Sequence, residues 1–259
     1  MSANYGLVRT SERELTQNLL KFYKHVKKSW MNLISILTQK TNISGENYKM
    51  FQKKESKSNH MEANILNESI WSISRNQPVA NHLRFVISII YSISDLERMA
   101  DYIMDIANII RQNKFNKEAI SVIRESLKLS YACMNSLLRN LETKDKIKID
   151  PNFAYKLANK VLNFYRIKYK EINKKLSNII FDKNSPKQIE DILTSISIIT
   201  KYSERNVDHA VNILENFIYV RESNFFFSKH KNSSLDFDSL NLSPLQKLSK
   251  KKKTNKLNI

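Results

Sequence analysis

Apolar residues recur every three or four positions along most of this chain, which is the period of a helix buried on one face. The clearest example lies near the amino terminus, where the apolar positions are Leu15, Leu19, Phe22, Val26, Trp30, Leu33 and Leu37. Comparable segments span about 11–39, 46–74, 78–111, 117–142, 151–182 and 186–222. The pattern therefore predicts six long helices joined by short connections.

Residues that break helices are few and well placed. Two glycines and four prolines in 259 residues provide little of the turn chemistry that a hairpin-rich sheet requires. Pro78, Pro151 and Pro186 stand where the first residue of a helix tolerates proline. Asp150 and Ser185, directly before two of them, are good N-cap residues. The sequence therefore predicts an all-α fold.

A short acidic phrase occurs twice. It reads ERMAD at residues 97–101 and ERNVD at residues 204–208, which are 107 positions apart. Each copy falls in the third helix of a set of three, and long helices with short connections favour antiparallel neighbours. We therefore predict two tandem three-helix bundles from an internal duplication. The predicted parts are an N-terminal extension (1–10), a first bundle (11–113), a second bundle (114–227) and a disordered lysine-rich tail (228–259).

The acids of each copy lie one helical turn apart, where like charges repel each other. Four residues further on, Asp105 and Asn212 extend each copy into a row of oxygen-bearing side chains. At about 100° per residue, Leu83, Ile90 and Glu97 fall almost on one line, so the acids interrupt an apolar seam. Carboxylates in such a place need a cation, a shared proton or hydrogen bonds.

Two interpretations of these rows stay open at the level of sequence. Hard cations take oxygen ligands, and carboxylate-bearing helices in a bundle can hold iron or manganese. Alternatively, Arg98, Arg205 and nearby lysines neutralise the acids in ordinary ion pairs. Under the first interpretation, the candidate metal ligands are Glu97, Asp101, Asp105, Glu204, Asp208 and Asn212.

The chain is strongly basic, and part of its positive charge lies in a lysine-rich tail. The net charge is +18, and eight lysines against two aspartates give residues 228–259 a charge of +6. Such a tail can contact anionic lipid or nucleic acid, although tails of this composition are more often simply solvated.

Cys133, the single cysteine, excludes an intramolecular disulfide and a cysteine-rich zinc site. No apolar run approaches about 18 residues and the N-terminus has no leader pattern, so we expect a soluble cytoplasmic protein.

Two regions resemble the signatures of the PhoU family, the accessory proteins of bacterial phosphate transport. The first region reads RNQPVANHLRFV at residues 75–86 and SDLERMAD at residues 94–101. The second reads ERNVDHAVNILE at residues 204–215. The resemblance covers about residues 8–222 and implies a pair of three-helix bundles, in agreement with the helix pattern.

The resemblance also implies a function. A PhoU-like protein would be a cytoplasmic regulator, peripheral at the inner face of the membrane, that restrains high-affinity phosphate uptake and is not an enzyme. The implied partners are the ATP-binding subunit of the phosphate ABC transporter and, where present, a phosphate sensor histidine kinase, while homodimer formation stays open. Because family members bind metal at the acidic phrases, the implied cofactor is iron, zinc or another divalent cation.

The sequence departs from the family pattern in its second half. The family's middle helix adds acids that face the acidic phrase, and Glu62 fills this role in the first half. The position 107 residues later is Tyr169, within a basic stretch. We therefore expect metal mainly at the first site, with Glu62 as an added ligand, and a lysine salt bridge at the second. We expect His209 to have a surface or capping role and Arg84 to pair with an acid across the bundle.

The sequence argues against a catalytic function. A ferritin-like di-iron oxidase needs Glu-x-x-His pairs, and the chain contains none. It also has no P-loop and no grouping typical of a catalytic triad. The remaining alternative is a polybasic adaptor that binds nucleic acid or a membrane surface through the lysine-rich tail.

Overall fold

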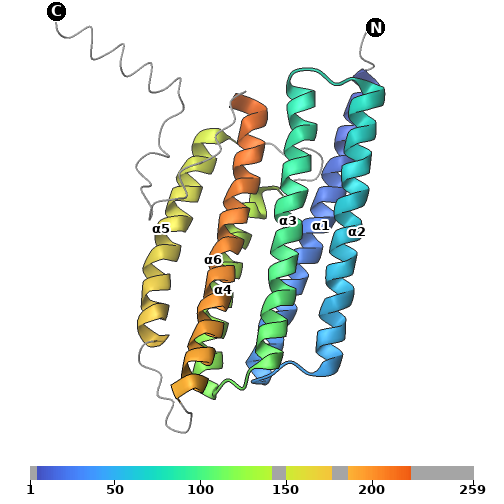
Figure 1. Ribbon diagram of the computed structural model, residues 1–259. Coiled ribbons are helices and arrows are strands. Elements are labelled where there is room, and N and C mark those ends of the chain that lie inside the picture. The colour runs from blue at the N-terminus through green and yellow to red at the C-terminus, as the bar shows by residue number, and fades with distance from the viewer. Residues whose placement is uncertain (1–4, 142–149, 177–185, 223–259) are drawn as a thin grey trace, which may run out of the picture. The chain divides into compact units, whose positions relative to one another are not determined.

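The regular structure described for this protein is entirely helical. The computed structural model describes residues 5–141, 150–176 and 186–222 (Figure 1). The elements are α1 (Tyr5–Gln39), α2 (Gly45–Asn76), α3 (Asn81–Gln112), α4 (Lys117–Leu138), a short 3₁₀ helix η1 (Arg139–Leu141), α5 (Pro151–Leu176) and α6 (Pro186–Glu222). The predicted all-α class is confirmed. Residues 1–4, the predicted end of the fifth helix and the lysine-rich tail lie outside the described residues.

Polar caps set the start of three helices. Ser44 and Asn116 cap α2 and α4 through their side-chain oxygens. Asp150 caps α5, because its Oδ2 accepts a hydrogen bond from the backbone N–H of Phe153 at 3.1 Å. Asp150 is therefore the N-cap that the sequence predicted. Ser185, the other predicted cap, lies outside the described residues.

Two predicted helix starts are wrong. Helix α1 already begins at Tyr5, upstream of the predicted start at residue 11. Helix α3 begins at Asn81 rather than at Pro78. Gln77 ends α2 in the left-handed conformation with φ 45°, and Ala80 has φ 50°. These angles are uncommon for residues with a side chain, so the chain turns sharply here before α3 can begin.

The helices of each half pack against one another, and the two halves are joined. Helices α1, α2 and α3 contact each other, and α4 contacts α5 and α6. The most extensive contact of all joins α3 to α6, which lie side by side in Figure 1, and α1 also contacts α4. The six helices therefore form one compact unit. The bundle boundaries predicted from the sequence stay a prediction.

Trp30 anchors the core of the first half. Its side chain is fully buried, and its indole Nε1 donates to the backbone carbonyl of Met99 at 3.2 Å. Phe22 and Leu33 on the same face of α1 are also fully buried. Since Met99 lies between the two acids of the first phrase, the packing of α1 fixes the turn of α3 that carries them.

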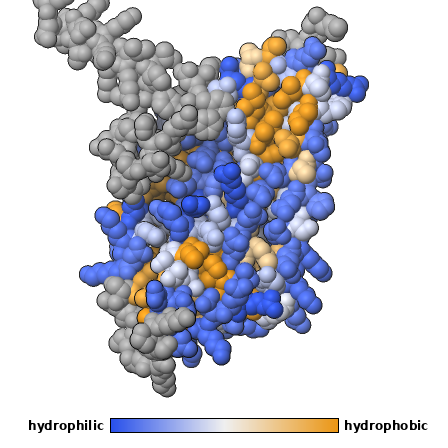
Figure 2. All heavy atoms as spheres, viewed as in Figure 1, coloured by the Kyte–Doolittle hydropathy of each residue, from blue (hydrophilic) through white to orange (hydrophobic). Residues whose placement is uncertain are grey.

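The surface seen in Figure 2 is mostly polar, with apolar side chains gathered in separate groups. No helix in the described ranges is long and apolar enough to cross a bilayer. Among the described residues the large exposed apolar side chains are Leu7, Met31, Ile70, Trp71, Val79, Tyr91, Phe153, Phe164, Ile167, Leu193 and Ile198. Three of these eleven belong to α5.

Candidate functional site at the acidic phrases

A hydrogen-bonded group of side chains joins α3 to α6. His209 Nδ1 lies 2.7 Å from Asp95 Oδ1, and His209 Nε2 lies 3.0 Å from the hydroxyl of Tyr102. Asn212 also donates to Asp95 Oδ1, at 3.3 Å. His209 is only 8% exposed, so the predicted surface or capping role is wrong. Its ring instead bridges the two helices that carry the acidic phrases.

The contact between Tyr102 and His209 joins equivalent positions of the two copies of the repeat. These residues are 107 positions apart, which is the repeat period, so each occupies the same place in its own half. The equivalents of Asp95 and His209 are Tyr202 and Tyr102, whose rings stack with centroids 4.9 Å apart. Asp95 and His209 therefore make a polar contact, whereas the equivalent pair Tyr202 and Tyr102 makes an aromatic one.

The first acidic phrase lies on a partly exposed strip of α3. Glu97 and Asp101 are half-buried, and Asp105 is exposed. Burial raises the pKa of Asp101 to about 7, and a hydrogen bond with Glu97 and the charges of Glu97, Glu55 and Asp105 act in the same direction. Near neutral pH, the carboxyl of Asp101 is therefore partly protonated.

Glu62 belongs to the same cluster, on the neighbouring helix α2. Burial raises the pKa of Glu62, the charge of Asp101 adds to this effect, and Arg98 opposes it. Asp105, in contrast, interacts with α6. Burial, the charge of Asp105 and a hydrogen bond to it raise the pKa of Tyr202. We define the first carboxylate cluster as Glu55, Glu62, Glu97 and Asp101.

The second acidic phrase has a different environment. Lys201 Nζ lies 2.6 Å from Glu204 Oε2, so the expected lysine salt bridge is present, and its lysine comes from α6 itself. On α5, Tyr165 and Tyr169 stack with ring centroids 5.6 Å apart. Burial raises the pKa of Tyr165, and the charges of Glu204 and Asp208 contribute to the rise. Tyr169 thus stands at the position equivalent to Glu62 of the first half, which makes the two sites unequal.

The carboxylates have the chemistry of metal ligands but are not arranged as a ligand set. Across residues 5–141, 150–176 and 186–222, no group of three or more His, Cys, Asp or Glu side chains is placed to hold a metal ion. Asn212, one of the predicted ligands, lies at the helix interface and donates to Asp95. Metal binding at either phrase therefore stays a prediction. The first carboxylate cluster is the better candidate, because Glu204 already has a cationic partner.

Two polar residues of the first signature have partners that the sequence did not reveal. His82 Nδ1 lies 2.7 Å from Glu12 Oε1 of α1. Arg84 donates to Asn81, one turn earlier on the same helix, instead of pairing with an acid across the bundle as predicted. The segment before the first acidic phrase therefore attaches the start of α3 to α1.

The sequence did not point to Asp95, and the role expected of His209 was wrong. Asp95 stands two positions before Glu97, and His209 directly follows Asp208. Neither residue is part of the repeated acidic pattern on which the site prediction was based. The one available signal was the equivalence of Tyr102 and His209 under the period of 107. That equivalence alone does not show that the two positions touch each other.

The chain resembles known proteins at the levels of domain, sequence and fold. A family model for the PhoU domain matches residues 19–110. The uncharacterized protein MG409 of Mycoplasma genitalium is 27% identical over 225 residues, which cover 86% of this chain and 98% of that protein. A phosphate-specific transport system accessory protein PhoU homolog of Clostridium acetobutylicum is 28% identical over 170 residues, 65% of this chain and 74% of that protein. The crystal structure of PhoU from Pseudomonas aeruginosa matches 83% of this chain and 99% of its own, with a TM-score of 0.64 and 22% identity.

Proposed function

Because this chain carries a PhoU domain and is related to PhoU proteins, we propose that it is a cytoplasmic negative regulator of high-affinity phosphate uptake. The observation that carries the proposal is the match of the PhoU domain to residues 19–110, which include the first acidic phrase. A related accessory protein of a phosphate-specific transport system supports it. We propose regulation rather than catalysis as the mode of action.

The proposed partners are the ATP-binding subunit of a phosphate ABC transporter and, where the cell has one, a phosphate sensor histidine kinase. The first carboxylate cluster is a local negative region on a chain whose net charge is +18. Glu97 and Asp101 are half-buried on the surface of α3, where a partner can reach them. Opposite charge at this point would orient a basic surface of the partner.

We propose that a divalent cation binds at the first carboxylate cluster. Oxygen ligands suit hard cations, and a cation would offset the burial and the neighbouring negative charges that raise the pKa of Asp101. Glu97 and Asp101 would supply the ligands from α3, and Glu62 would supply one from α2. The second phrase is the weaker candidate, because Lys201 neutralises Glu204.

The hydrogen-bonded group Asp95, His209 and Tyr102 has the order of an acid, a base and a hydroxyl, which invites comparison with a catalytic triad. Its position argues for a structural role. Both ring nitrogens of His209 are engaged, and the ring is buried between α3 and α6. A base in this place would bridge helices rather than meet a substrate.

Phosphate uptake in a deletion strain tests the proposed function. Loss of the protein should raise uptake when phosphate is abundant, and the protein should be retained by the immobilised ATP-binding subunit. Glu97→Gln combined with Asp101→Asn should weaken this retention by about tenfold, because it removes negative charge from the contact. Glu190→Gln, an exposed carboxylate of α6, is the matched control. Normal uptake together with no retention of the unaltered protein would refute the proposal.

A further inference from the structure

Helix α5 has an outer face that combines exposed apolar side chains with positive charge. Phe153, Phe164 and Ile167 are 54%, 49% and 61% exposed. At about 100° per residue these three side chains lie within about 60° of one another around the helix. The buried residues of α5, which include Tyr165 and Ile172, point away from this face. The apolar group is therefore an outward-facing feature and not a loose part of the core.

Lysines surround the apolar group. Helix α5 contains six lysines and one arginine against a single acid, Glu171, which gives it a net charge of +6. Lys156, Lys160 and Lys170 are exposed, and they lie on the same side of the helix as Ile167. The long lysine side chains can keep their charges in water while their methylene stems lie against apolar neighbours.

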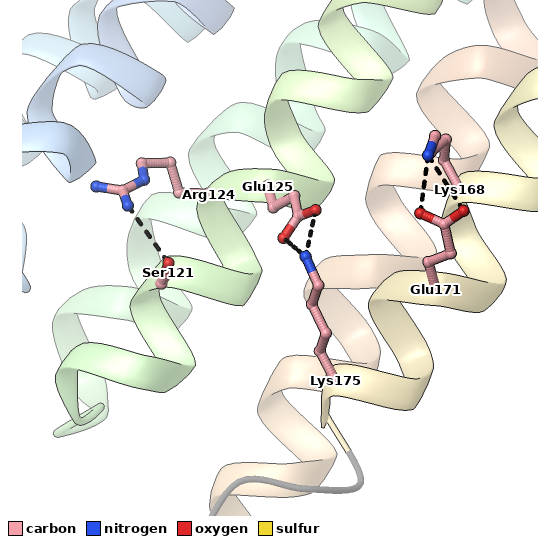
Figure 3. A network of polar contacts seen from close by, with 6 residues as sticks. All are labelled: Ser121, Arg124, Glu125, Lys168, Glu171 and Lys175. Carbon is pink, nitrogen blue, oxygen red and sulfur yellow. Dashed lines mark hydrogen bonds and ion pairs between the residues drawn. The ribbon is translucent and has the colours of Figure 1, made fainter.

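Two acids, Glu171 of α5 and Glu125 of α4, are paired with lysines of α5. Lys168 Nζ lies 2.9 Å from Glu171 Oε2, so the one carboxylate of the helix has a cationic partner (Figure 3). Lys175 Nζ lies 2.7 Å from Glu125 Oε2 of α4. These ion pairs use two of the six lysines, and Lys156, Lys160 and Lys170 are among the exposed cations of the outer face. The face therefore complements a surface whose outer layer is negatively charged and whose deeper layer is apolar.

We propose that the outer face of α5 binds the surface of an anionic lipid bilayer. A helix of 26 residues is about 39 Å long, so it can lie along a membrane plane with several lysines over lipid phosphates. The exposed aromatic and aliphatic side chains would enter the boundary between headgroups and acyl chains. This interaction goes beyond the proposed regulation, since it needs neither the transporter nor a metal ion.

The composition of the face favours lipid over nucleic acid. Ile167 offers no flat ring on which a base could stack, although it is the most exposed apolar residue of α5. The exposed cations named above are lysines, whereas specific contacts with bases use the planar fork of arginine more often. Lysines alternating with apolar residues along one helix face are typical of helices that lie at a membrane interface.

Sedimentation of the full chain with lipid vesicles tests the proposal. Vesicles of phosphatidylcholine with phosphatidylglycerol should retain the protein, and vesicles of phosphatidylcholine alone should not. Lys156→Gln with Lys160→Gln should weaken binding about fivefold for each lysine removed. Phe164→Ser with Ile167→Ser should weaken it about tenfold, because the apolar contribution is lost. All four positions are exposed, so circular dichroism should show unchanged helix content.

Matched variants on other helices serve as controls. Lys49→Gln with Lys53→Gln and Met31→Ser with Ile70→Ser change exposed residues of the same kinds on α1 and α2. These variants should bind vesicles as well as the unaltered protein. Binding that is equal in all variants would assign lipid contact to the lysine-rich tail and overturn the proposal. A loss confined to the lysine variant of α5 would indicate a general anion site and would also overturn it.

Discussion

His209 Nδ1 and Asp95 Oδ1 lie 2.7 Å apart and join α6 to α3 between residues that are 114 positions apart in the chain. Both side chains are largely buried, so water cannot readily replace either partner. A buried acceptor that loses its donor costs more free energy than the same loss at the surface. The pair therefore stabilises the contact between the two halves of the duplicated fold.

Replacing His209 by Ala should lower the free energy of unfolding by about 1–3 kcal/mol, because Asp95 would keep only the weaker hydrogen bond from Asn212. Urea unfolding followed by circular dichroism measures the change. His60→Ala is the matched control, since His60 is exposed and its ring bonds to Ser56 within α2. Its effect should stay within about 0.5 kcal/mol. Equal losses in the two variants would contradict the interface role.

The stability of the protein should depend on pH through Asp101. The fold raises the pKa of this carboxyl from its ordinary value of 3.8 to about 7. Between these values the folded state holds a proton that the unfolded state has released, so the contribution of Asp101 to stability is lost as the pH rises from about 4 to 7. Asp101→Asn should therefore be more stable than the unaltered protein at pH 8, by about 1 kcal/mol after allowance for solvent screening.

The difference between Asp101→Asn and the unaltered protein should vanish toward pH 4, where both side chains are neutral. Thermal unfolding at several pH values measures it. Glu190→Gln, which alters an exposed carboxylate of α6, should show no comparable trend. A constant difference across the range would mean that Asp101 is not protonated in the folded state.

Metal content should distinguish the two acidic phrases. Glu97→Gln should weaken binding of iron or zinc about tenfold, because it removes a carboxylate from the first carboxylate cluster. Glu204→Gln should leave the metal content unchanged, because Glu204 is paired with Lys201. Elemental analysis of protein purified without chelator measures both variants. Equal losses would refute the asymmetry, and unchanged stoichiometry in both variants would exclude metal from these phrases.

Trp30 should be among the most costly residues of the core to truncate. Trp30→Ala should lower the free energy of unfolding by about 3–5 kcal/mol, because it leaves a cavity and removes the bond to the carbonyl of Met99. Trp71→Ala is the matched control, since Trp71 is half exposed on α2 and should change stability by no more than about 1 kcal/mol. Urea unfolding compares the two. A larger effect at Trp71 would contradict the described packing.

The helices could be predicted well because their signals are local. Apolar spacing defined the six segments, and Asp150 marked the start of α5 through a bond to a residue only three positions away. The start of α3 could not be predicted in the same way. Pro78 is compatible with a helix start, but the left-handed conformations of Gln77 and Ala80 delay it. No local preference of glutamine or alanine specifies a positive φ, so these conformations could not be predicted from the residues themselves.

The asymmetry of the two acidic phrases was only partly predictable. Tyr169 at the place equivalent to Glu62 already indicated that the second phrase lacks acidic support. A lysine partner for Glu204 was expected from the sequence. Which lysine it is could not be predicted, because the pairing with Lys201 depends on the side-chain geometry of α6. Glu55 joined the first carboxylate cluster only through the packing of α2 on α3.

The sequence by itself determined the all-α class, the six helices and the repeat of 107 residues, because helical period, caps and repeated motifs act over a few neighbouring positions. Only the tertiary structure decided that the halves meet along α3 and α6, and that His209 pairs with Asp95 instead of facing solvent. Both outcomes depend on contacts between residues more than 100 positions apart. Such contacts are selected by the burial and shape of whole helix faces, and the pattern along a single helix does not encode its partner.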